Sequence, residues 1–79
     1  MQEFQIAFRS FDHVQKFVQL AAGQTFEVLV ESQCRRVDAK SFMVMLSLDY
    51  RQPLRVTADC DPEEFDRFHR QVAKALELN

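Results

Sequence analysis

The sequence has few of the residues that build several common kinds of functional site. Its 79 residues include one glycine, Gly23, together with two prolines, two cysteines and no tryptophan. A lone glycine cannot form a glycine-rich loop around a phosphate group, so sites of that kind are excluded. The cysteines, Cys34 and Cys60, fall in different predicted loops and give no disulfide framework. We therefore expect reduced thiols in a cytoplasmic protein.

The sequence also lacks a dominant charge and a long apolar run. Its net charge is -2, and the only basic doublet, Arg35-Arg36, lies in a predicted turn. Nucleic-acid binding depends on clustered lysine and arginine, which neutralise phosphates. A signal peptide or a spanning helix needs a longer apolar segment than any found here. We expect neither nucleic acid nor a membrane as a partner.

No cluster of residues has the spacing of a metal or catalytic site. The residues best suited to bind a metal are scattered along the chain: His13, Cys34, Cys60 and His69. The densest carboxylates lie around the start of the last predicted helix: Asp59, Asp61, Glu63 and Glu64. Acidic residues are favoured there by the helix dipole, which explains them without catalysis. We predict no metal, no cofactor and no enzymatic activity.

The spacing of apolar residues changes several times along the chain and predicts seven elements in one domain, residues 1–79. A period of two predicts strands over 4–8, 25–31, 36–39 and 54–58. Helical spacing predicts a first helix over 11–22 that begins at Ser10 and ends at Gly23. Ser41 is expected to cap a short second helix. Asp61, Pro62 and Glu64 form a strong start signal for the last helix.

The order β-α-β-β-α-β-α predicts an α+β fold with three helices on one face of a four-stranded, mainly antiparallel sheet. Within it, residues 37–48, Val-Asp-Ala-Lys-Ser-Phe-Met-Val-Met-Leu-Ser-Leu, resemble the second-helix region of HPr. HPr is the histidine-containing phosphocarrier protein of the sugar phosphotransferase system. The resemblance extends over most of the chain and implies the open-faced sandwich of that family. A ferredoxin-like unit with an added helix has the same element order, but the short second helix and full-length third favour the HPr fold.

The resemblance also implies where a phosphocarrier histidine would lie. In HPr proteins it is the N-cap of the first helix, within a His-Ala-Arg-Pro run, where helix N–H groups and the arginine stabilise the anion. An ungapped alignment through Phe17-Val18-Gln19 replaces this run with Ser10, Phe11, Asp12 and His13. A phosphoserine ester does not readily pass its phosphoryl group onward, and no adjacent base activates the hydroxyl. We therefore predict that the chain is not a competent phosphocarrier.

Other features of the family are matched. Ser41 occupies the place of the regulatory phosphorylation site of Gram-positive HPr proteins. Phe42, Met43 and Leu46 match the apolar docking surface of the family, with Phe11 as a fourth member. The sequence thus predicts a regulatory or protein-binding module, whose partners are phosphotransferase-system or HPr-kinase-like proteins.

Two alternatives remain at this point. Shifting the alignment by three residues makes His13 the phosphoryl acceptor, with Lys16 as a nearby cation, and gives a working phosphocarrier that accepts its phosphoryl group from enzyme I. The other alternative is a ferredoxin-like module that binds a ligand or pairs with itself through its open sheet face, at Leu29, Arg55 and Thr57. Otherwise we interpret His13 and His69 as surface residues.

Overall fold

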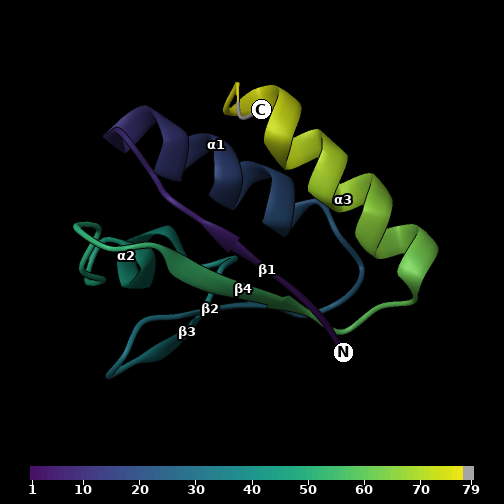
Figure 1. Cartoon of the computed structure of the whole chain (residues 1–79), viewed down its shortest axis with the longest axis horizontal. Helices are drawn as coiled ribbons and strands as arrows, with labels where there is room; N and C mark the ends of the chain where they lie inside the picture. Colours follow the sequence, from purple (N-terminus) through teal and green to yellow (C-terminus); the bar gives the residue numbers. More distant parts are fainter. Residues whose placement is uncertain (78–79) are drawn as a thin grey trace.

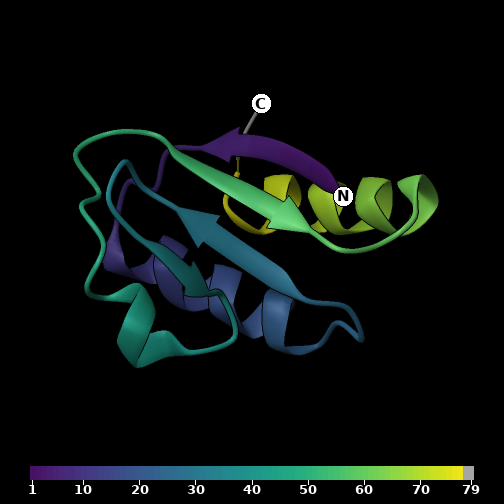
Figure 2. The same cartoon turned by 90° about the horizontal axis from the view of Figure 1, so that it is seen from below.

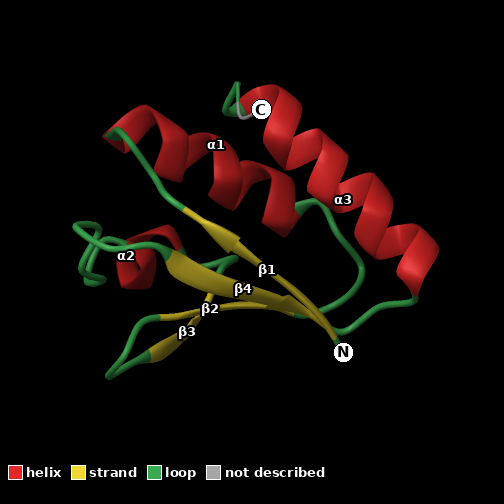
Figure 3. Cartoon of the chain, viewed as in Figure 1, coloured by secondary structure: helices red, strands yellow, loops and turns green. Residues whose placement is uncertain are grey.

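A computed structural model describes residues 1–77 and contains all seven predicted elements (Figures 1 and 3). In chain order they are β1 (Gln2–Ile6), α1 (Phe11–Ala22), β2 (Val28–Glu31), β3 (Arg36–Asp38), α2 (Phe42–Met45), β4 (Leu54–Ala58) and α3 (Pro62–Ala75). The predicted order and the α+β class are confirmed. No helix in residues 1–77 is long and apolar enough to cross a membrane.

The strands form one sheet in the order β1-β4-β2-β3, and each neighbouring pair is antiparallel. The hairpin between β2 and β3 pairs Val30 with Val37, while β4 lies between β1 and β2 and pairs Val56 with both Phe4 and Val30. In a ferredoxin-like unit, β1 and β3 occupy the two central positions, whereas here they form the two edges. The ferredoxin-like alternative is therefore wrong for the fold.

The three helices cover one face of the sheet, and the core lies between them and the strands (Figures 1 and 2). Helix α1 contacts both α2 and α3. Strand β4 turns Leu54, Val56 and Ala58 into the core, as the period of two predicts, although Thr57 on the other face is buried as well. The largest side chains of the core are phenylalanines. The ring centroid of Phe17 lies 5.2 Å from that of Phe8 and 6.0 Å from that of Phe68. Aromatic burial of this kind supplies much of the apolar area that a small domain must hide.

The opposite face of the sheet carries a chain of ion pairs that crosses it from edge to edge. Arg55 of β4 lies 2.8 Å from a carboxylate oxygen of Glu31 and 3.8 Å from one of Glu3. Arg36 of β3 continues the chain, 3.8 Å from Glu31. Hydrogen bonding to Glu31 raises the pKa of Arg55 above its usual value. We call the set Glu3, Arg55, Glu31 and Arg36 the charge ladder.

Several element boundaries differ from the predicted ones. Phe8 lies beyond the end of β1, yet it is buried, because its ring packs against those of Phe17 and Tyr50. Phe26 packs on the core from the connection before β2 rather than from the strand itself. Gly23 ends α1 as predicted, but its φ of -80° is one that any residue can adopt. Phe8 and Phe26 are therefore apolar because they pack on the core, and not because they belong to a strand.

Helix α3 begins as predicted, with a complete capping box. A carboxylate oxygen of Asp61 accepts a hydrogen bond from the backbone N–H of Glu64 at 2.8 Å, and the Glu64 side chain accepts one from the backbone N–H of Asp61 at 3.3 Å. These bonds satisfy two N–H groups that the helix itself leaves unpaired. Pro62 follows the cap, where its missing N–H costs nothing.

We expect Asp61→Ala to lower the free energy of unfolding by about 1 kcal/mol, because the cap is lost. The measurement is urea denaturation followed by circular dichroism. Asp59→Ala is the matched control: it removes the same charge from an exposed side chain that makes no hydrogen bond within the described residues. Equal losses in the two variants would show that charge, rather than capping, accounts for the effect.

Candidate functional site

The N-terminal end of α1 is formed by Ser10, the residue that the resemblance places at the phosphocarrier position. Its backbone is extended, with φ -159° and ψ 164°, and its hydroxyl accepts a hydrogen bond from the backbone N–H of His13 at 3.2 Å. The predicted N-cap is confirmed. The hydroxyl oxygen is therefore already engaged in holding the first turn of the helix.

The imidazole of His13 folds back over this end of the helix. Its Nδ1 accepts a hydrogen bond from the backbone N–H of Arg9 at 3.3 Å, and the residue is half-buried rather than fully exposed to solvent. The expectation of a simple surface histidine is thus only partly right. Lys16, the cation proposed to assist it, lies 3.1 Å from a carboxylate oxygen of Asp12. That ion pair places a negative charge next to the lysine.

Helices α1 and α2 together expose a group of large apolar side chains. The exposed fractions are 59% for Phe11, 77% for Met43 and 42% for Leu46. Phe42 is half-buried, and its ring meets that of Phe11 edge to face with centroids 5.4 Å apart. The structure thus brings Phe11 of α1 next to Phe42 and Leu46, and Met43 lies exposed on the same short helix; we call Phe11, Phe42, Met43 and Leu46 the α1–α2 surface. Val44 borders it and was not predicted from the sequence.

The short helix α2 exposes these side chains because it is anchored by other residues. Met45 points into the core and is fully buried. The Tyr50 hydroxyl donates a hydrogen bond to the Met45 carbonyl, and burial raises the pKa of that hydroxyl to about 12. The ring of Tyr50 also packs against Phe8, with centroids 5.4 Å apart. The phenol therefore stays protonated and ties the end of α2 to the core.

Ser41 precedes α2 at the N-cap position, but its hydroxyl makes no capping hydrogen bond. The prediction that this side chain caps the helix is therefore wrong. The backbone of Ser41 still makes the first helical hydrogen bond, because its carbonyl accepts from the backbone N–H of Met45 at 3.0 Å. Ser41 is half-buried and lies next to Phe42 of the α1–α2 surface.

The connection after α2 carries a close ion pair. The guanidinium of Arg51 donates two hydrogen bonds to the carboxylate of Asp49, at 3.0 and 2.9 Å. The side-chain hydrogen bond from Arg51, with a further one from its backbone N–H, lowers the pKa of Asp49 to about 2. Asp49 therefore stays charged throughout the physiological range.

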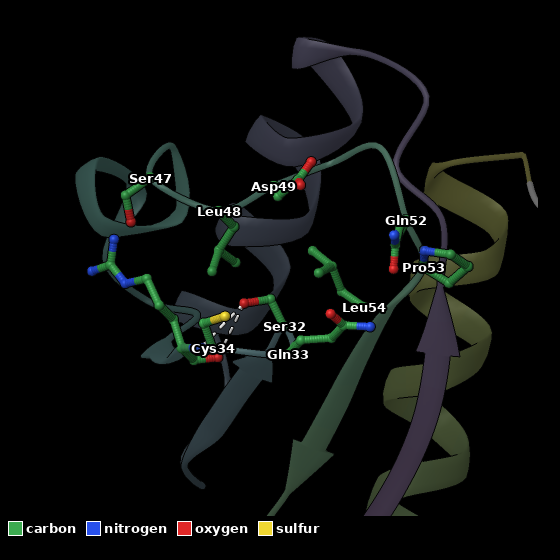
Figure 4. A pocket seen from close by; sticks show the side chains of 10 residues that line it. Ser32, Gln33, Cys34, Ser47, Leu48, Asp49, Gln52, Pro53 and Leu54 are labelled. Atoms are coloured by element: carbon green, nitrogen blue, oxygen red, sulfur yellow. Dashed lines mark hydrogen bonds between the residues drawn. The ribbon is translucent and has the colours of Figure 1, made fainter.

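A small cleft of about 210 Å³ lies between the β2–β3 turn and the connection before β4 (Figure 4). Cys34 lies on the turn side, while Gln52 and Pro53 lie on the opposite side. Ser32 holds the turn closed through a hydrogen bond from the Arg35 backbone N–H to its hydroxyl, at 3.2 Å. Within residues 1–77 no histidine lines the cleft, and its one carboxylate, Asp49, is paired with Arg51, so the cleft offers no histidine base to the Cys34 thiol.

The remaining candidate ligands do not converge. His69 lies on α3, where its ring stacks on that of Phe4 with centroids 4.3 Å apart. Both cysteines are free thiols, and burial together with nearby carboxylates raises the pKa of Cys60. Within residues 1–77, no group of three or more histidine, cysteine, aspartate or glutamate side chains is placed to hold a metal ion.

Comparison with known proteins assigns the chain to a family. A family model described as the PTS HPr component phosphorylation site matches residues 13–77. HPr-C-His from Thermoanaerobacter tengcongensis is 26% identical, with a TM-score of 0.75 over 98% of this chain and 92% of that one. Crh, a catabolite repression protein of Bacillus subtilis whose crystal structure is a domain-swapped dimer, is 23% identical, with a TM-score of 0.65 over 99% and 94% of the two chains. No curated protein matches the sequence significantly. The chain, matched over most of its length by the family model, belongs to the HPr family of the phosphotransferase system.

Proposed function

We propose that this HPr-family chain works by binding protein partners through the α1–α2 surface and is not a competent phosphocarrier. The observation that carries the proposal is the exposure of Phe11 and Met43, at 59% and 77%, side by side with Leu46 at 42%. Large apolar side chains gathered at one place on a small domain are typical of a binding surface. The partners we propose are phosphotransferase-system or HPr-kinase-like proteins, encountered in the cytoplasm.

The chemistry at the start of α1 supports the second half of the proposal. The hydroxyl of Ser10 accepts a hydrogen bond from the backbone N–H of His13. No side-chain base in residues 1–77 is hydrogen-bonded to that hydroxyl. Asp12 lies in the first helical turn, where the resemblance places the arginine of the family, and its ion pair with Lys16 leaves no free cation of the described residues at that position to stabilise a phosphoryl group. A stable serine ester would also be a poor donor in the next transfer.

Ser41 is the residue at which we propose regulation. It lies beside Phe42 and Met43, so a phosphate there would add close to two negative charges next to the apolar surface. Because apolar binding surfaces are disrupted by uncompensated charge, phosphorylation would lower affinity for a partner that docks by apolar contact.

Phosphoryl transfer through His13 is a second candidate, favoured by one observation. The family match begins at His13 and leaves Ser10 outside. The Nδ1 atom of His13 accepts from Arg9, which leaves Nε2 as the ring nitrogen without a protein partner in the described residues. In the neutral ring Nε2 carries the proton, so phosphoryl transfer would require either loss of that proton from Nε2 or release of the Nδ1 lone pair from the Arg9 N–H.

Mass spectrometry separates these possibilities. The full chain is incubated with enzyme I and phosphoenolpyruvate, and separately with HPr kinase and ATP, with a competent HPr as the positive control. We expect no acid-labile product from enzyme I and an acid-stable product from the kinase that Ser41→Ala abolishes. An acid-labile product lost in His13→Ala would overturn the non-carrier proposal, and an unmodified Ser41 would overturn the regulatory one.

A further inference from the structure

A hollow of about 450 Å³ opens at the N-terminal end of α1, next to the α1–α2 surface. Its floor is apolar, since Phe8 and Val14 line it and are only 7% and 4% exposed. Phe11 and Leu46, which are exposed, form its sides together with the ring of Tyr50. The hollow thus lies between two segments far apart in the sequence, residues 8–14 and 46–51. Its volume is in the range of small-molecule sites.

Two cationic residues and two residues with hydroxyl groups, Ser10 and Tyr50, make up the polar part of the lining. The two cationic residues are Arg9 and Arg51. Arg51 is neutralised by Asp49, whereas Arg9 makes no ion pair within residues 1–77. Asp12, the carboxylate in the first turn of α1, is not part of the lining and is paired with Lys16. The balance of charge at the hollow is therefore positive.

We propose that this hollow binds a small organic anion that joins one carboxylate to an aromatic or branched aliphatic body. The body would lie on Phe8 and Val14, and the carboxylate would meet the guanidinium of Arg9, with Arg51 beside it. Ligand sites generally combine an apolar lining with a few polar groups that fix orientation, and arginine is well suited to a carboxylate. The positive charge of Arg9 at the hollow is the reason for proposing a ligand with a carboxylate group.

Shape distinguishes this site from the protein-binding surface proposed above. Met43, the most exposed residue of the α1–α2 surface, does not line the hollow, whose floor is recessed and buried. The inference goes beyond the proposed function and does not depend on it. The two sites share Phe11 and Leu46, however, so a bound anion would compete with a docked protein.

The test is an NMR titration of the ¹⁵N-labelled full chain with 4-phenylbutyrate, the neutral 4-phenylbutyramide and acetate. We expect saturable shifts centred on Arg9, Phe11, Val14, Leu46 and Tyr50 with the carboxylate, at least about tenfold weaker binding of the amide, and no saturable binding of acetate. Leu46→Ser should weaken the binding of both aromatic ligands.

Variants of two arginines separate recognition of the anion from general charge. Arg9→Gln should weaken carboxylate binding by about tenfold and leave amide binding unchanged, because only the charged head loses its partner. Arg67→Gln removes the same charge from an exposed position on α3 and should change neither affinity. The proposal is overturned by an absence of saturable shifts, by shifts centred elsewhere, or by equal affinity for the carboxylate and the amide.

Discussion

Replacing Phe68 with alanine is expected to remove about 3–5 kcal/mol of unfolding free energy, because it opens a cavity at the centre of the core. Phe68 is 1% exposed, and its ring centroid lies 6.0 Å from that of Phe17 and 5.9 Å from that of Phe26. The side chain joins α3 to α1 and to the segment before β2. For a domain of 79 residues the total stability is on the order of 4–12 kcal/mol, so this one change removes a large share of it.

Urea denaturation followed by circular dichroism measures this loss, with Phe11→Ala as the matched control. Phe11 is the same residue type, but it is 59% exposed and should cost less than about 1 kcal/mol. The expected pattern is a large shift of the midpoint for Phe68 and a small one for Phe11. Similar losses for the two variants would contradict the division between core and surface phenylalanines described above.

The second large effect is expected at Met43. If partners dock on the α1–α2 surface, Met43→Asp places a charge at its most exposed member and should weaken binding by about 30- to 1000-fold, equivalent to about 2–4 kcal/mol. The side chain is 77% exposed, so the fold should tolerate the change. Isothermal titration calorimetry with enzyme I and with HPr kinase gives the dissociation constants.

Arg67→Asp is the control for that experiment. Arg67 is exposed on α3, which lies on the other side of α1 from α2, so the variant introduces the same aspartate away from the proposed surface. Its binding should match that of the unmodified chain. Unchanged affinity in Met43→Asp, or equal weakening in the two variants, would rule out docking on the α1–α2 surface.

The parts of the fold that could be predicted are those with local signals. The capping box at Asp61 and Glu64 involves residues three apart, so the sequence alone identifies the start of α3. Strand β4 was recognisable because Leu54 and Val56 alternate with Arg55, and one face of the sheet is buried. Its place in the centre of the sheet depends on contacts between distant segments, which periodicity does not encode.

The candidate site was harder to predict because α2 is short and apolar on all sides. Residues 42–46 are all apolar, so no period distinguishes the buried Met45 from the exposed Met43. The resemblance to HPr, rather than periodicity, identified the exposed members. The hollow beside them had no sequence signal at all, because Phe8 and Tyr50 lie 42 positions apart and meet only in the folded chain.

The charge ladder also has a consequence for how the molecule behaves in a crowded solution. A sheet with one uncovered face and two free edges is open to stacking and edge pairing with other chains. Here Glu3 of β1 and Arg36 of β3 place charges of opposite sign at the two edges, with Arg55 and Glu31 between them. An apolar sheet laid on this face would have to strip water from all four charges without offering them partners. The ladder therefore makes this face a poor surface for apolar stacking, in contrast to the exposed apolar side chains of the α1–α2 surface on the helical side.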